Sequence, residues 1–75
     1  VDAVLDGSWG QWVVEVKTGD IDSSRLRGLA EFARRFPAYR PLVVCDEVGR
    51  STARRLGLTT QLWRDFLLDG PQAAE

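Results

Sequence analysis

The chain has 75 residues, of which 44% are hydrophobic and 28% are charged, with a formal net charge of −1. These values predict one small globular domain, and a net charge near zero gives no argument for nucleic-acid binding. The chain has no histidine and one cysteine, which excludes histidine-dependent catalytic triads and argues against a structural zinc site. Because Cys45 cannot form an internal disulfide, we expect a reducing, cytoplasmic location, and no apolar run is long enough to span a membrane.

The first predicted elements are two strands, Val1–Asp6 and Gln11–Lys17, which both alternate in polarity. The glycine-bounded connection GSWG between them is typical of a hairpin. In the register that pairs Leu5 with Trp12, the apolar residues of both strands gather on one face.

A helix and a further strand are expected next. Apolar residues recur at helical spacing from about Ser23 to Phe36, where Asp22 or Ser23 can cap the helix and Pro37 stops it. The short apolar run Pro41–Cys45 predicts a buried, central strand with Cys45 as a small core residue.

The remaining elements are shorter. RSTARRLG (residues 50–57) predicts two helical turns ended by Gly57, LTTQ (58–61) is a weak strand, and LWRDFLLD (62–69) is a final helix. Leu62 and Phe66 should face the core, with Trp63 and Leu67 as further candidates. The order predicts an α/β fold with a mixed sheet flanked by helices, as one domain over residues 1–70 with a tail at 71–75.

The hairpin register brings two acids together. Asp2 faces Glu15, and like charges directly opposite each other destabilise a strand pair, which marks a candidate functional site. A magnesium ion held by Asp2, Glu15 and the backbone carbonyl of Val16 would resolve the conflict. Lys17, on the same face, could then orient a water or stabilise charge on a phosphate. The alternative is an ordinary solvent-exposed hairpin face, which the same alternation explains.

Asp2 followed after twelve residues by EVK resembles the active-site motif of the PD-(D/E)xK nuclease superfamily. The text VDAVLDG…WVVEVKTG…LRGLAEFARRFP is more similar to one branch, the C-terminal nuclease-like domain of bacterial and archaeal AAA-type ATPases of unknown function. The final LWRDFLLDG resembles the way those chains end.

This resemblance implies a restriction-endonuclease-like fold, with Asp2 and Glu15 as metal-binding acids, Lys17 as the catalytic lysine and Mg²⁺ or Mn²⁺ as cofactor. It implies hydrolysis of DNA and an upstream ATPase domain in the same chain. The superfamily's N-terminal helix is missing here, so we expect the 75 residues alone to be inactive and to self-associate through the surface that this helix would cover.

Two interpretations remain open for the arginines and for the function. Arg25 and Arg27, near the start of the predicted helix, could contact a nucleic-acid backbone, or they could simply cover its outer face. The chain could be the nuclease that the motif implies, or a catalytically inactive module for nucleic-acid docking, protein interaction or dimerisation.

Overall fold

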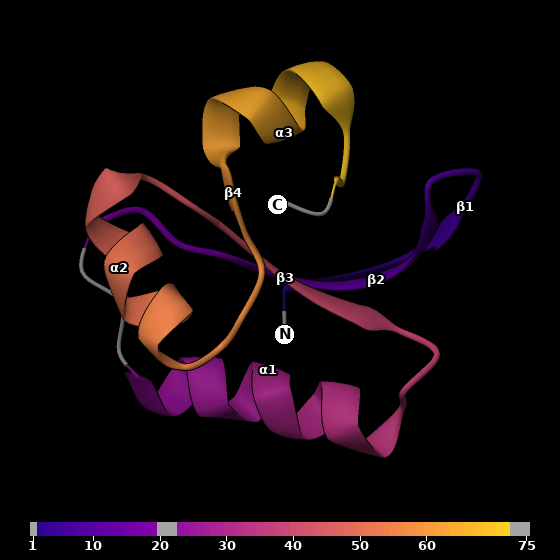
Figure 1. The fold of residues 1–75 in the computed structure, drawn as a ribbon. Helices are drawn as coiled ribbons and strands as arrows, with labels where there is room; N and C mark the ends of the chain where they lie inside the picture. The colour runs from indigo at the N-terminus through magenta and orange to yellow at the C-terminus, as the bar shows by residue number, and fades with distance from the viewer. Residues whose placement is uncertain (1, 20–22, 73–75) are drawn as a thin grey trace.

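The computed structural model describes residues 2–19 and 23–72 of the chain. These residues form a small α/β fold with one four-stranded mixed sheet and three helices (Figure 1). The strands, which lie side by side in chain order, are β1 (Ala3–Gly7), β2 (Gly10–Val16), β3 (Arg40–Cys45) and β4 (Thr60–Leu62). The helices are α1 (Ser23–Arg35), α2 (Glu47–Arg55) and α3 (Trp63–Asp69). The order of elements is the one predicted from the sequence.

The hairpin has the register that the alternation predicts. β1 and β2 are antiparallel, with Ala3 opposite Val14 and Leu5 opposite Trp12. The turn between them closes at Gly10, whose φ of 105° lies in the region that glycine adopts without strain. The predicted capping of α1 by Asp22 lies outside the described residues.

The other two strand pairs are parallel. β2 pairs with β3, placing Glu15 beside Val43, and β3 pairs with β4. Parallel neighbours require a crossover connection, which α1 supplies between β2 and β3 and α2 supplies between β3 and β4. β3 is therefore an interior strand, as expected, and β2 and β3 end at the same edge of the sheet.

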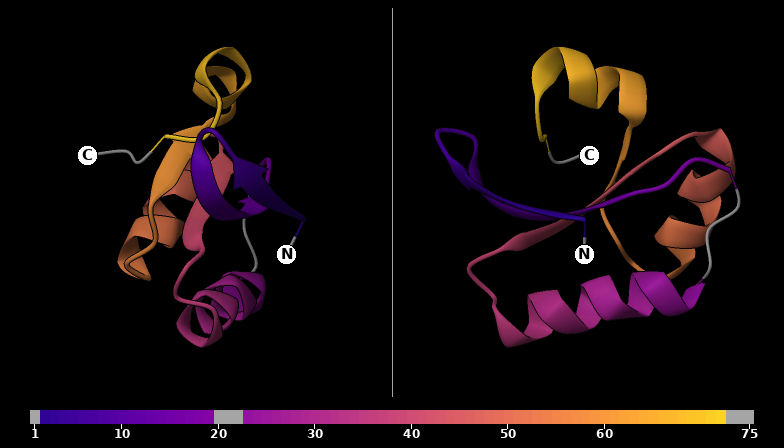
Figure 2. Two further views of the ribbon diagram at one scale, coloured as in Figure 1. Left: turned by 90° about the vertical axis from the view of Figure 1, so that its right-hand side faces the viewer. Right: turned by 180° about the vertical axis from the view of Figure 1, so that it is seen from behind.

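Helices cover both faces of the sheet (Figure 2). On one face, α1 and α2 bury a core cluster made of Val13, Leu26, Leu29, Val43, Cys45, Ala53 and Leu58. On the other face, Phe66 of α3 packs against a second cluster made of Trp12, Val14, Leu42 and Val44. The predicted burial of Cys45 is confirmed, at 0% exposure.

The last helix contributes less to the core than the sequence suggested. Phe66 packs inward as predicted, but Trp63 and Leu67 are 44% and 72% exposed, so their candidacy for the core was wrong. The reason is geometric, because a seven-residue helix on the surface of a sheet turns only one narrow stripe toward it. None of the helices in the described ranges is long and apolar enough to cross a membrane.

The described part of the expected tail is attached to the sheet. The buried side chain of Gln61 in β4 donates from Nε2 to the Gly70 carbonyl over 3.0 Å, and its Oε1 accepts from the Gln72 N–H over 3.1 Å. Pro71, between them, is buried. Gly70 has a φ of 72°, and Trp9 lies so close that a Cβ at Gly70 would meet the indole nitrogen at 3.3 Å.

The packing predicts a sharp contrast between two leucines. Leu29, with 0% exposure, holds α1 on the sheet, whereas Leu68 of α3 is 82% exposed. Leu29→Ala should lower the free energy of unfolding by about 2–5 kcal/mol through lost burial and a cavity. Leu68→Ala should change it by less than about 0.5 kcal/mol. Urea unfolding followed by circular dichroism measures both, and equal losses would contradict this packing.

Candidate functional site

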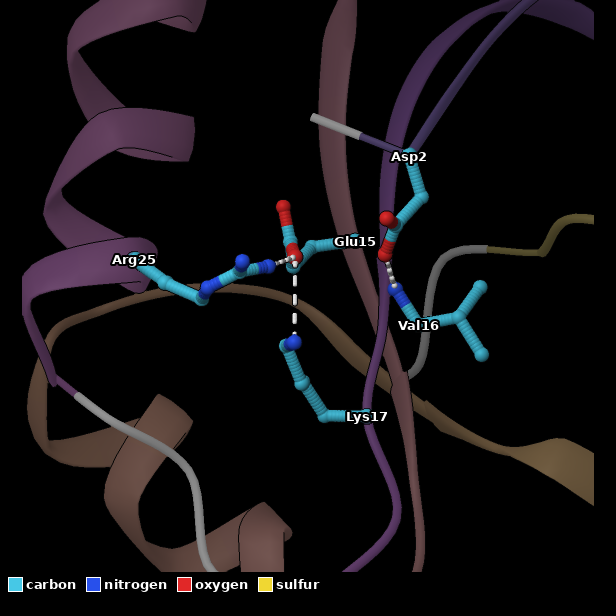
Figure 3. Close-up of polar contacts among 5 residues, drawn as sticks. All are labelled: Asp2, Glu15, Val16, Lys17 and Arg25. Carbon is cyan, nitrogen blue, oxygen red and sulfur yellow. Dashed lines mark hydrogen bonds and ion pairs between the residues drawn. The ribbon is translucent and has the colours of Figure 1, made fainter.

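A buried carboxylate lies near the end of the central strand β2. Glu15 shares its face of the sheet with Val13, which α1 covers, and its exposure is only 1%. Burying an ionised carboxylate is costly unless charges of opposite sign compensate for it. Two cations do so here: Lys17 Nζ lies 3.8 Å from Glu15 Oε2, and Arg25 Nη1 lies 3.5 Å from the same oxygen (Figure 3).

The second acid, Asp2, lies just before β1 and is exposed. Its Oδ2 accepts a hydrogen bond from the Val16 N–H over 2.8 Å (Figure 3). Its own N–H donates to the Val14 carbonyl over 2.9 Å. The bond from Val16 is the main reason why the pKa of Asp2 is lowered. The positive charge of Lys17 lowers this pKa further, while desolvation opposes the shift.

The structure therefore brings Asp2, Glu15 and Lys17 together around the end of β2. Arg25, from the first turn of α1, joins them through its contact with Glu15. Arg27 is an exposed residue of the same helix. Val16, whose carbonyl was the predicted ligand, contributes its N–H to Asp2, and its side chain is 44% exposed.

Asp46 is a residue of this edge that the sequence reasoning missed. It follows β3 directly and caps α2, with Oδ1 accepting from the N–H groups of Val48 and Gly49. Its Oδ2 accepts from the Gly19 N–H over 2.8 Å, which ties the segment after Lys17 to the end of β3. The bonds from Gly19 and Gly49 lower the pKa of Asp46. An aspartate between a buried strand and a helix is an N-cap signal that could have identified it.

The donor atoms suit a hard cation such as Mg²⁺. Asp2 and Glu15 offer carboxylate oxygens, and Mg²⁺ is commonly bound by one or two carboxylates, with waters and substrate phosphates completing the coordination. Within residues 2–19 and 23–72, no cluster of three or more Asp, Glu, Cys or His side chains is arranged to hold a metal. Burial raises the pKa of the Cys45 thiol, which makes this residue a poor ligand and a poor nucleophile.

Comparison with known proteins adds no relative. No protein-family model matches the chain, and neither the curated proteins nor the solved structures contain a match.

The lowered pKa of Asp2 predicts how stability depends on pH. Because the pKa in the folded state lies below the ordinary value of 3.8, ionised Asp2 stabilises the fold above that pH. This contribution is lost as the pH falls through the lowered pKa. Asp2→Asn should therefore be less stable than the wild type at about pH 7, and the difference should shrink as the pH falls below 3.8 and through the lowered pKa. Urea unfolding over this range checks it, and a pH-independent difference would contradict it.

Proposed function

We propose that the chain is a restriction-endonuclease-like nuclease domain that hydrolyses phosphodiester bonds of DNA with a divalent metal ion. It would follow an ATPase domain in a longer chain. The observation that supports this most is the convergence of Asp2, Glu15 and Lys17 at the end of β2, with Glu15 buried to 1% exposure. These are the three residues that carry the resemblance to the nuclease motif.

The burial of Glu15 supports a functional role because stability alone does not explain it. An apolar residue on this face would extend the core cluster around Val13 without the cost of removing a carboxylate from water. Charged groups that are kept at such a cost are candidates for binding or chemistry.

Each residue would have a defined task. Asp2 and Glu15 would hold Mg²⁺, with the Val16 carbonyl as a further oxygen, and the bound ion would supply charge neutralisation at a phosphate and a more acidic water. Lys17, whose side chain is 25% exposed, can reach both Glu15 and solvent. Its ammonium would stabilise negative charge that develops on the scissile phosphate. Arg25 and Arg27 would contact the DNA backbone.

A second candidate is a catalytically inactive module for nucleic-acid docking or protein interaction. It is favoured by the contacts of Glu15, whose charge Lys17 and Arg25 already balance without a metal. It is also favoured by α3, where Leu67 and Leu68 are 72% and 82% exposed. Beside α3, a hollow of about 250 Å³ is lined by Asp46, Glu47, Leu62, Trp63 and Arg64, and an exposed tryptophan beside an arginine suits a nucleic-acid base.

Metal binding separates the two candidates. For the nuclease, Mn²⁺ at about a hundred times its Kd should raise the free energy of unfolding by about 2.7 kcal/mol, which appears as a higher Tm. Glu15→Gln should abolish this shift because it removes the ligand charge. Glu31→Gln is the matched control, since Glu31 is an exposed carboxylate of α1 paired with Arg34, and it should leave the shift intact. A wild type without a shift would favour the inactive module.

Catalysis requires a separate test in a chain that includes the proposed upstream ATPase domain. Lys17→Ala should retain the Mn²⁺-induced shift but lower the rate of DNA cleavage by about a hundredfold or more, because charge stabilisation in the transition state is lost. The readout is nicking of supercoiled plasmid. Cleavage at the wild-type rate would remove Lys17 from the proposed site.

The inactive module predicts association through α3. At high concentration the 75-residue chain should then sediment as a dimer or larger species, because Leu67 and Leu68 expose a contiguous apolar surface. The double substitution of these leucines by aspartate should shift the chain to a monomer in analytical ultracentrifugation. A wild type that remains monomeric would argue against this candidate.

A further inference from the structure

Beyond the proposed metal site, on which this inference rests, we infer that Arg25 is an exchangeable counter-ion of Glu15. A divalent cation that binds Glu15 displaces the guanidinium group, and the released Arg25 then becomes available to a phosphate of the nucleic acid. The same residue thus couples occupancy of the metal site to binding of the substrate backbone.

The contact between Arg25 and Glu15 is loose. Its 3.5 Å separation exceeds the roughly 2.7–2.9 Å of a charge-assisted hydrogen bond, and the Arg25 side chain is 58% exposed. About two and a half turns further along the same helix, Arg34 Nε donates to Glu31 Oε2 over 3.0 Å, which is a closer arrangement. Arg25 therefore balances the charge of Glu15 by electrostatic attraction without a short hydrogen bond. Little interaction energy is lost when its guanidinium moves into water.

Arg25 is also the cation that can leave. Both Arg25 and Lys17 approach the same carboxylate oxygen, Oε2, so a metal ion on this oxygen would face two positive charges. Lys17 follows β2 directly, is only 25% exposed, and its N–H donates to the Val44 carbonyl over 2.8 Å. Arg25 reaches the oxygen from α1 (Figure 3). Because most of its side chain is exposed to solvent, it has room to move away from Glu15.

The exchange has a consequence for substrate binding. While Arg25 neutralises Glu15, its guanidinium is partly occupied and less available to a phosphate. When a divalent cation takes over that charge, the guanidinium is released at the same edge of the fold. Bound metal should therefore increase the affinity for the nucleic-acid backbone. By thermodynamic linkage, bound nucleic acid should increase the affinity for the metal by the same factor.

The first test uses Mn²⁺ as the only ligand and isothermal titration calorimetry on the 75-residue chain. Because Arg25 competes with the metal for Oε2, Arg25→Gln should bind Mn²⁺ about two- to fivefold more tightly than the wild type, the range expected for an exposed ion pair. Arg35→Gln, which changes an exposed arginine in the last turn of the same helix, should leave the affinity unchanged. Arg25→Lys, which keeps a cation, should lie closer to the wild type than Arg25→Gln.

The second test measures backbone binding with a short fluorescein-labelled DNA duplex by fluorescence anisotropy. Mn²⁺ should increase the affinity of the wild type and of Arg35→Gln, and most of this increase should be lost in Arg25→Gln. Circular dichroism confirms that each variant is folded before the titrations are compared.

The outcomes separate this inference from the proposed function. If the wild type and Arg25→Gln bind Mn²⁺ equally, or the variant binds more weakly, the exchange is refuted while the metal site stands. If neither protein binds Mn²⁺, both the metal site and the exchange are refuted. The exchange is supported if Arg25→Gln is the variant that binds Mn²⁺ more tightly than the wild type, and if the same variant loses the Mn²⁺-dependent gain in DNA affinity.

Discussion

The parallel pairing of β2 with β3 determines where Glu15, Arg25 and Asp46 lie. A parallel neighbour cannot be reached by a tight turn, so the chain must cross over one face of the sheet, and α1 makes that crossing. α1 covers the face that carries Val13 and Glu15. Glu15, near the end of the hairpin, is buried as a result. The two strands also end at one edge, so Asp46 can hold Gly19 across that edge.

The buried carboxylate of Glu15 is costly for the stability of so small a domain. A domain of this size buries a limited share of its surface, and few of its interior positions can be given to charge. The chain accepts one at Glu15 and surrounds it with groups from three separate segments: Asp2 before β1, Lys17 after β2 and Arg25 on α1.

Local patterns in the sequence were sufficient for much of the fold. The hairpin register followed from alternation, because a slip of one residue would have turned Trp12 away from its apolar face. The extent of α1 and the end of α2 before Gly57, with its φ of 74°, followed from apolar spacing and glycine preference. The proximity of Asp2 to Glu15 followed from the register alone.

The burial of Glu15 could not be predicted in this way. Alternation assigns Glu15 to a face of the strand but does not say which face a crossover helix will cover. The rule that crossovers are right-handed gives that face only when the paired strands are already known. The contact of Arg25 with Glu15 depends on the same packing. For Trp63 and Leu67 the error was in the other direction, because burial was predicted and the residues are exposed. An apolar residue on a short surface helix need not be buried.

The attachment of α3 has a consequence for the motions of the protein. None of the residues of α3 is fully buried; Phe66 packs the helix against the sheet, and the two hydrogen bonds of the Gln61 side chain hold the segment that follows it. Local opening free energies fall where buried apolar contacts are few. The amide hydrogens of α3 should therefore exchange with deuterium well before those of β2 and β3. Each time α3 detached from the sheet, the apolar cluster of Trp12, Val14, Leu42 and Val44 would be briefly exposed to solvent. Exposed apolar surface of this kind favours aggregation.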